Sequence, residues 1–285
     1  MTKDHRLDQV FRYVDDNIER FVIEFRDLLR IPSIAKTLHV TKCSEEVKDL
    51  MTKAGVKVEV DSVEEKVPNI FGEFKSGFNR KTLLLYSHFD VYPVNNIDKW
   101  RRDPFVADVI DGKIIARGTS DSKGNLIALI KATEAIYHIL NGVSLDLKFL
   151  FGGDEELGSP SLPQFIKEHQ DKLNADAAVV FDATLDEGNV PALNLGRGNT
   201  FTNDDEVVQA ACKASEKTYN GLPTIYRSVE TYPMHLISKL GIKTLSTGCG
   251  SFKGSTHSIN ESIAVDDFSK GIKYAAAILY FYGLK

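Results

Sequence analysis

The 285-residue chain has few cysteines, a single tryptophan and no excess of basic charge. Its three cysteines, Cys43, Cys212 and Cys249, form no Cys-x-x-Cys pair, which argues against a disulfide framework or a thiolate zinc site. The net charge of −5 implies no broad basic surface for nucleic acid. The longest apolar stretch, near residues 275–282, is too short to span a bilayer, and the charged N-terminus has no signal-peptide core. We therefore expect a cytoplasmic protein without a nucleic-acid or membrane partner.

Motifs for other common chemistries are missing as well. Ser120 and Ser122 lie outside any Gly-x-Ser-x-Gly segment, which disfavours a serine hydrolase. The chain has neither a phosphate-binding Gly-x-x-x-x-Gly-Lys loop nor a Gly-x-Gly-x-x-Gly turn. A nucleotide-binding α/β protein is therefore only a weak alternative.

The hydrophobic pattern predicts strands that alternate with helices. Hydrophobic residues make up 42% and charged residues 26% of the chain, as in ordinary globular proteins. One long apolar stripe from Leu7 to Leu28 predicts a first helix, and a second is expected from Ser44 to Gly55. Short apolar runs such as Thr82–Tyr86 are typical of buried strands. We expect an α/β three-layer sandwich with a mixed, largely parallel central sheet flanked by helices.

Ionisable residues follow the ends of three predicted strands, and two further loops contribute more. The candidate residues are His88, Asp90, Asp121, Glu155, Glu156, Asp182 and His257. Because sites in open α/β sheets lie outside the carboxyl ends of the strands, we expect these side chains to converge.

Convergence of the four carboxylates Asp121, Glu155, Glu156 and Asp182 would be unfavourable without added positive charge. Two like charges about 4 Å apart repel by roughly 4 kcal/mol at an effective dielectric constant near 20. Imidazole and carboxylate ligands without cysteine suit zinc, with manganese or cobalt as alternatives. Two divalent metal ions would explain the number of groups, with one carboxylate bridging them and one glutamate left as a base.

The spacing of the residues suits these roles. His88 and Asp90 lie two apart, so Asp90 can accept a hydrogen bond from the non-ligating nitrogen of His88. Glu155 and Glu156 are adjacent and diverge, so one can bind metal while the other takes a proton from the attacking water.

Five ordered segments of this sequence resemble a known family. They read HFDV, DKWRRDPF, DGKIIARGTSDSKG, GGDEELGS and STHSINE. Together they resemble the M20 family of dinuclear zinc metallopeptidases and deacylases, which includes carnosinase-like and Cys-Gly dipeptidases, acetylornithine deacetylase and succinyl-diaminopimelate desuccinylase. The resemblance implies a hydrolase that cleaves the amide bond of a small dipeptide or N-acyl amino acid.

The resemblance also implies a role for each candidate residue. The implied roles are ligands of one metal (His88, Asp182), ligands of the other (Glu156, His257), a bridge (Asp121), a general base (Glu155) and a partner of the ligand His88 (Asp90). It further implies a cis peptide bond between Asp121 and Ser122.

This sequence differs from the family pattern at the lid, a smaller domain that family members carry as an insertion after the strand ending near Asp182. Here the junction near residues 196–204 passes almost directly into the helix expected at Asp205. We therefore expect a single catalytic domain over residues 1–285 whose lid is absent, either naturally or by excision. Since the family often dimerises through its lid, a monomer is slightly favoured. The lid also supplies a histidine that steadies the tetrahedral intermediate, so the alternative is a lidless core that binds metal with little or no turnover.

Overall fold

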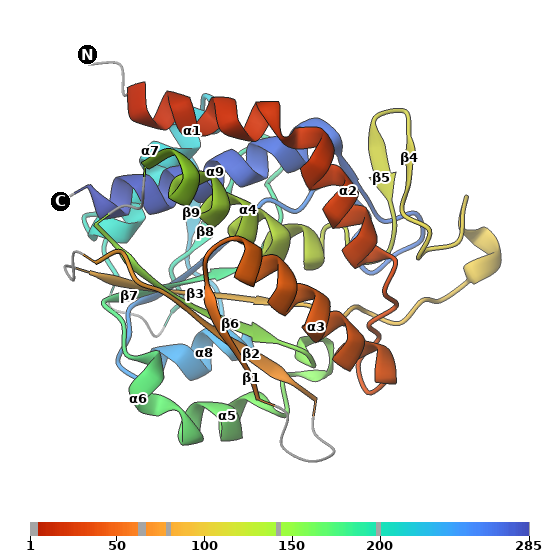
Figure 1. Ribbon diagram of the computed structural model, residues 1–285, viewed down its shortest axis with the longest axis horizontal. Coiled ribbons are helices and arrows are strands. Elements are labelled where there is room, and N and C mark those ends of the chain that lie inside the picture. Colours follow the sequence, from red (N-terminus) through yellow and green to blue (C-terminus); the bar gives the residue numbers. More distant parts are fainter. Residues whose placement is uncertain (1–4, 62–66, 78–80, 141–143, 198–200, 285) are drawn as a thin grey trace.

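The computed structural model describes residues 5–61, 67–77, 81–140, 144–197 and 201–284. Within these residues, helices cover both faces of an eight-stranded sheet, which gives three layers (Figure 1). The strands, in spatial order, are β1 (Lys57–Asp61), β2 (Asn69–Phe74), β6 (Asp146–Gly152), β3 (Thr82–His88), β7 (Ala177–Phe181), β10 (Thr244–Thr247), β8 (Ala192–Asn194) and β9 (Thr224–Tyr226). A second sheet contains β11 (Ser262–Ala264), β5 (Lys113–Ile115) and β4 (Asp108–Ile110).

The helices divide between the two faces of the large sheet (Figure 1). One side carries α1 (His5–Asp16), α2 (Ile18–Leu29), α3 (Leu38–Lys53), α4 (Lys123–Leu140), α7 (Glu206–Tyr219) and α9 (Val265–Gly283). The other side carries α5 (Leu162–Glu168), α6 (Gln170–Leu173) and α8 (Tyr232–Ser238). The expected mixed sheet flanked by helices is confirmed.

The centre of the large sheet is parallel. Strands β6, β3, β7 and β10 run in the same direction, so their carboxyl ends meet at one edge. Antiparallel β2 and β1 extend the sheet on one side, and β8 pairs antiparallel with β10 on the other. This parallel centre brings the loops after the strands together.

The strands bury both of their faces. Along β3, Leu83 and Leu85 join the larger hydrophobic core, whereas Leu84 and Tyr86 join the core on the opposite face. Because successive side chains point to opposite faces, an uninterrupted apolar run is what a doubly covered strand requires.

Two helix boundaries differ from the sequence-based expectation. The N-terminal helix is divided at Asn17, whose Nδ2 donates a hydrogen bond to the carbonyl of Tyr13, and the chain bends there (Figure 1). The apolar stripe crosses this bend without interruption, so periodicity alone predicted one helix. The next helix begins at Leu38, and Ser44 lies inside it, where its hydroxyl donates to the carbonyl of Thr41.

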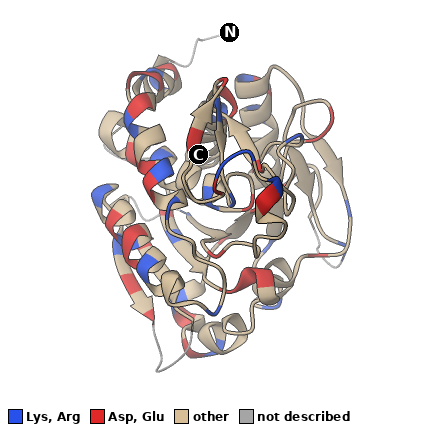
Figure 2. Ribbon diagram, turned by 90° about the vertical axis from the view of Figure 1, so that its right-hand side faces the viewer, with Lys and Arg blue, Asp and Glu red and all other residues tan. Residues whose placement is uncertain are grey.

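The surface carries charge of both signs. Acidic and basic residues alternate along the helices at the left of Figure 2. None of the described helices combines the length and the apolar character needed to cross a bilayer.

Candidate metal centre

The structure brings the predicted site residues together at the carboxyl edge of the parallel strands. They come from the end of β3 (His88), the loop after it (Asp90), the segment before α4 (Asp121), the 3₁₀ turn after β6 (Glu155 and Glu156), the loop after β7 (Asp182) and the loop before β11 (His257).

Asp121 lies between the two histidines. Its Oδ1 is 3.0 Å from His88 Nε2, and its Oδ2 is 2.9 Å from His257 Nε2. The Asp121–Ser122 peptide bond is cis, as the resemblance implied. Each oxygen of one carboxylate therefore faces a different imidazole, which is the arrangement a bridging ligand needs.

Each imidazole also faces a second carboxylate. His88 Nε2 lies 3.2 Å from Asp182 Oδ1, and His257 Nε2 lies 3.1 Å from Glu156 Oε2. The structure thus contains two groups of potential metal ligands that share Asp121, and within each group the ligand atoms lie within 4.8 Å of one another.

The hydrogen-bonding capacity of the site suits metal ions better than protons. A single ring nitrogen carries at most one proton, yet His88 Nε2 faces both Asp121 and Asp182. Asp182 Oδ1 is buried and makes no hydrogen bond, although it lies 3.2 Å from His88 Nε2. A buried carboxylate oxygen without a hydrogen bond is costly, and a cation held between the facing groups would remove that cost.

Both imidazoles have raised pKa values. Burial disfavours the charged form of His88, but Asp182, Asp121 and Asp90 hold its pKa well above the ordinary value. Hydrogen bonds to Asp121 and Glu156 raise the pKa of His257 to about 10. These shifts measure how strongly the carboxylates attract positive charge.

The pKa values of Glu155 and Asp121 are shifted in opposite directions. Burial raises the pKa of Glu155 to about 7. The nearby charge of His88 lowers this pKa, whereas the neighbouring carboxylates raise it further. Burial would also raise the pKa of Asp121, but hydrogen bonds from the two imidazoles hold it below its ordinary value. Glu155 Oε2 lies 4.0 Å from His88 Nε2, and Glu155 belongs to neither group of potential ligands. This placement leaves the Glu155 carboxylate beside the two groups of potential ligands.

Asp90 holds two segments of the site in place. As its spacing predicted, Asp90 Oδ1 lies 3.2 Å from His88 Nδ1, which leaves Nε2 directed at Asp121. Both carboxylate oxygens also accept backbone hydrogen bonds, Oδ1 from Glu155 N at 3.1 Å and Oδ2 from Glu156 N at 3.0 Å. Sequence reasoning missed this second role, because it requires β3 and β6 to be neighbours.

Glu261 is a second organising carboxylate, which sequence reasoning missed. It is fully buried, and its oxygens lie 2.6 Å from Arg117 Nη1, 2.8 Å from Ser120 N and 3.2 Å from Asp121 N. It therefore fixes the backbone from which Asp121 projects. The signal was present, because Glu261 ends the STHSINE segment and Arg117 begins RGTSDSKG.

Tyr92 supports the other histidine. Its ring stacks on His257 with a centroid distance of 4.2 Å and an interplanar angle of 14°. Because His257 is partly exposed, this stacking restrains a ring that the loop alone would leave free to turn.

Comparisons with known proteins identify the family of the chain. The model of peptidase family M20/M25/M40 matches residues 84–280. The chain belongs to this family. The matched region contains every predicted site residue.

Relatives in the M20 family include two dipeptidases. The human Beta-Ala-His dipeptidase is 28% identical over 215 residues, which cover 68% of this chain and 42% of that protein. The Schizosaccharomyces pombe Cys-Gly metallodipeptidase dug1 is 30% identical over 214 residues, which cover 69% of this chain and 45% of that protein. The chain thus matches less than half the length of these curated relatives.

Solved structures share the fold. The M20 family metallo-carboxypeptidase Sso-CP2 from Sulfolobus solfataricus superposes with a TM-score of 0.86 at 20% identity, covering 93% of this chain and 99% of that chain. The di-peptidase Dug1p from Saccharomyces cerevisiae gives a TM-score of 0.84 at 16% identity, covering 99% and 100%.

The contacts of Glu261 allow its support of Asp121 to be tested by substitution. Glu261→Gln leaves the buried Arg117 without its counter-charge and turns amide hydrogens toward backbone donors. The free energy of unfolding of the metal-free protein, measured in urea, should fall by about 3–5 kcal/mol. Zinc affinity should fall by about 10- to 100-fold, because Asp121 loses its support.

The exposed Glu187 provides the matched control. Glu187→Gln should change neither the free energy of unfolding nor the zinc affinity. Unchanged stability and zinc affinity in Glu261→Gln would show that this carboxylate does not organise the site.

Proposed function

We propose that this chain is a metal-dependent hydrolase that cleaves the amide bond of a small dipeptide or an N-acyl amino acid. The observation that carries the proposal is the pair of imidazole–carboxylate groups that share Asp121, with Glu155 beside them. Membership of the M20 family supports it independently.

The residues would hold two divalent cations, zinc in the first place, with manganese or cobalt as alternatives. His88 and Asp182 would hold one ion, Glu156 and His257 the other, and Asp121 would bridge them. When bound, such ions supply Lewis acidity, which polarises the scissile carbonyl and makes the attacking water more acidic.

Glu155 is the general base in this proposal. Its carboxylate takes a proton from the attacking water, whose oxygen then bonds to the carbonyl carbon. When the carbon–nitrogen bond breaks, Glu155 passes that proton to the leaving amine nitrogen. Asp90 keeps the proton of His88 on Nδ1, so Nε2 stays available as a ligand.

The substrate class rests on the relatives. Their names describe dipeptidases for Beta-Ala-His and for Cys-Gly and, at 27% identity, a succinyl-diaminopimelate desuccinylase from Rickettsia felis. Their shared chemistry is hydrolysis of an amide bond in a small molecule. The choice between a dipeptide and an N-acyl amino acid is to be made with a panel of both.

Replacement of the proposed base separates catalysis from metal binding. Glu155→Gln should lower turnover of any hydrolysed substrate by about 10²- to 10⁴-fold, because proton transfer is lost. Its zinc content, measured by elemental analysis, should equal that of the unaltered chain. Asp182→Asn is the comparison variant and should lose zinc as well as activity. Full activity in Glu155→Gln would remove this residue from the mechanism.

We further propose that the chain lacks the lid. β8 ends at Asn194 and α7 begins at Glu206, and a segment of that length is too short for a further domain. Residues 198–200 of the expected junction lie outside the described residues. If the lid's contribution to turnover is indispensable, the alternative is a core that binds metal with little or no turnover, and the same substrate panel distinguishes the two.

Small-angle X-ray scattering tests the lidless arrangement. A monomer isolated by size exclusion should scatter as one compact lobe with a radius of gyration of about 19 Å, the value expected for a globular domain of this length. An elongated, two-lobed particle would contradict the proposal.

A further inference from the structure

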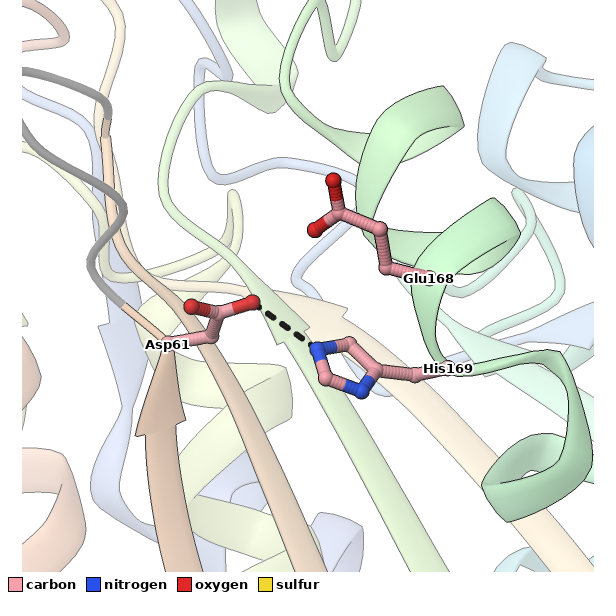
Figure 3. A group of neighbouring side chains, drawn as sticks. All are labelled: Asp61, Glu168 and His169. Carbon is pink, nitrogen blue, oxygen red and sulfur yellow. Dashed lines mark hydrogen bonds and ion pairs between the residues drawn. The ribbon is translucent and has the colours of Figure 1, made fainter.

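A second group of potential ligands lies outside the centre described above. Asp61 ends β1, Glu168 ends α5, and His169 follows it (Figure 3). Asp61 Oδ2 lies 2.9 Å from His169 Nε2, and one ligand atom from each of the three residues lies within 4.8 Å of the others. Figure 3 shows the Glu168 carboxylate on the α5 side, across from Asp61. Proximity of acidic groups alone would not indicate a ligand.

The pairing of β1 with β2 adds a fourth polar group. Asp61 and Asn69 are direct partners in this antiparallel pair, so both side chains point to the same face of the sheet. Asn69 Nδ2 donates a hydrogen bond to Ser161 Oγ, the residue before α5, at 2.9 Å. The Asn69 side chain is therefore held toward α5 on the same face as Asp61.

The oxygen of the Asn69 amide is the decisive feature. Asn69 is only 3% exposed, and its Oδ1 is buried without a hydrogen-bond partner. Asn69, Asp61 and Glu168 line the same small cavity, whose volume is about 20 Å³. A cavity of this size has room for one water molecule or one ion. Asn69 lines this cavity and carries a buried oxygen without a hydrogen-bond partner, so an occupant that binds that oxygen would remove an energetic cost.

We propose that Asp61, Glu168 and His169, together with the side-chain oxygen of Asn69, form a second divalent-cation site that takes zinc. One imidazole with carboxylate and amide oxygens is a donor set that zinc accepts. The ion would replace the proton shared by His169 Nε2 and Asp61 Oδ2, and it would supply the Asn69 oxygen with its missing partner.

The site would tie an edge strand to a helix. β1 lies at the edge of the large sheet, and its last residue would be linked through the ion to the C-terminal end of α5. Ser161, which fixes Asn69, also donates its hydroxyl proton to Asp154 Oδ1 at 2.9 Å, directly before Glu155. The proposed site is therefore connected to the turn that carries the proposed base.

The difference in bound zinc between the unaltered chain and its variants tests the site. The unaltered chain, His169→Gln and Glu168→Gln are equilibrated with the same buffered zinc and analysed for bound metal. Each variant should hold about one ion fewer per chain than the unaltered protein. Glu168→Gln leaves the His169–Asp61 contact intact, which guards against a folding defect in the histidine variant. His39→Gln, at an exposed histidine on α3, is the matched control and should bind as much zinc as the unaltered protein.

Zinc should also raise the melting temperature of the unaltered protein by more than that of either variant. Equal zinc content and equal zinc-induced shifts in all four proteins would overturn the proposal and assign the cavity to a water molecule. Because the count is a difference, it is independent of what the Asp121 centre holds, so either proposal can fail without the other.

Discussion

Two imidazole nitrogens that each face two carboxylates are the constraint on which the structure of this edge of the sheet depends. Asp121 is common to both sets, with one oxygen 3.0 Å from His88 and the other 2.9 Å from His257. Protons satisfy such a cluster only in part, because Asp182 Oδ1 makes no hydrogen bond even though it lies 3.2 Å from His88 Nε2. Two cations would satisfy it fully, and they would also remove repulsions of roughly 4 kcal/mol for each close pair of carboxylates.

Two buried carboxylates outside the ligand set hold this cluster together. Asp90 joins the imidazole of His88 to the backbone of the turn that carries Glu155 and Glu156. Glu261 joins the loop before β11 to the backbone of Asp121. Each therefore connects segments that are distant in sequence, and these contacts hold the backbone at Asp121, Glu155 and Glu156.

The sequence predicted what depends on local pattern. The apolar run at 82–86 identified β3. Parallel strands then required His88 and Asp182, at the ends of β3 and β7, to meet at one edge, and they do. The features that it missed depend on tertiary neighbours. The backbone contacts of Asp90 require β6 beside β3, and the bend at Asn17 interrupts a helix without interrupting its apolar stripe.

The proposed centre requires cations on both sides of Asp121. Anomalous diffraction at the zinc absorption edge, from crystals equilibrated with saturating zinc, tests this requirement most directly. Two anomalous peaks are expected, one between His88, Asp121 and Asp182 and the other between Asp121, Glu156 and His257. Ordered ligand side chains without an anomalous peak beside Asp121 would contradict it.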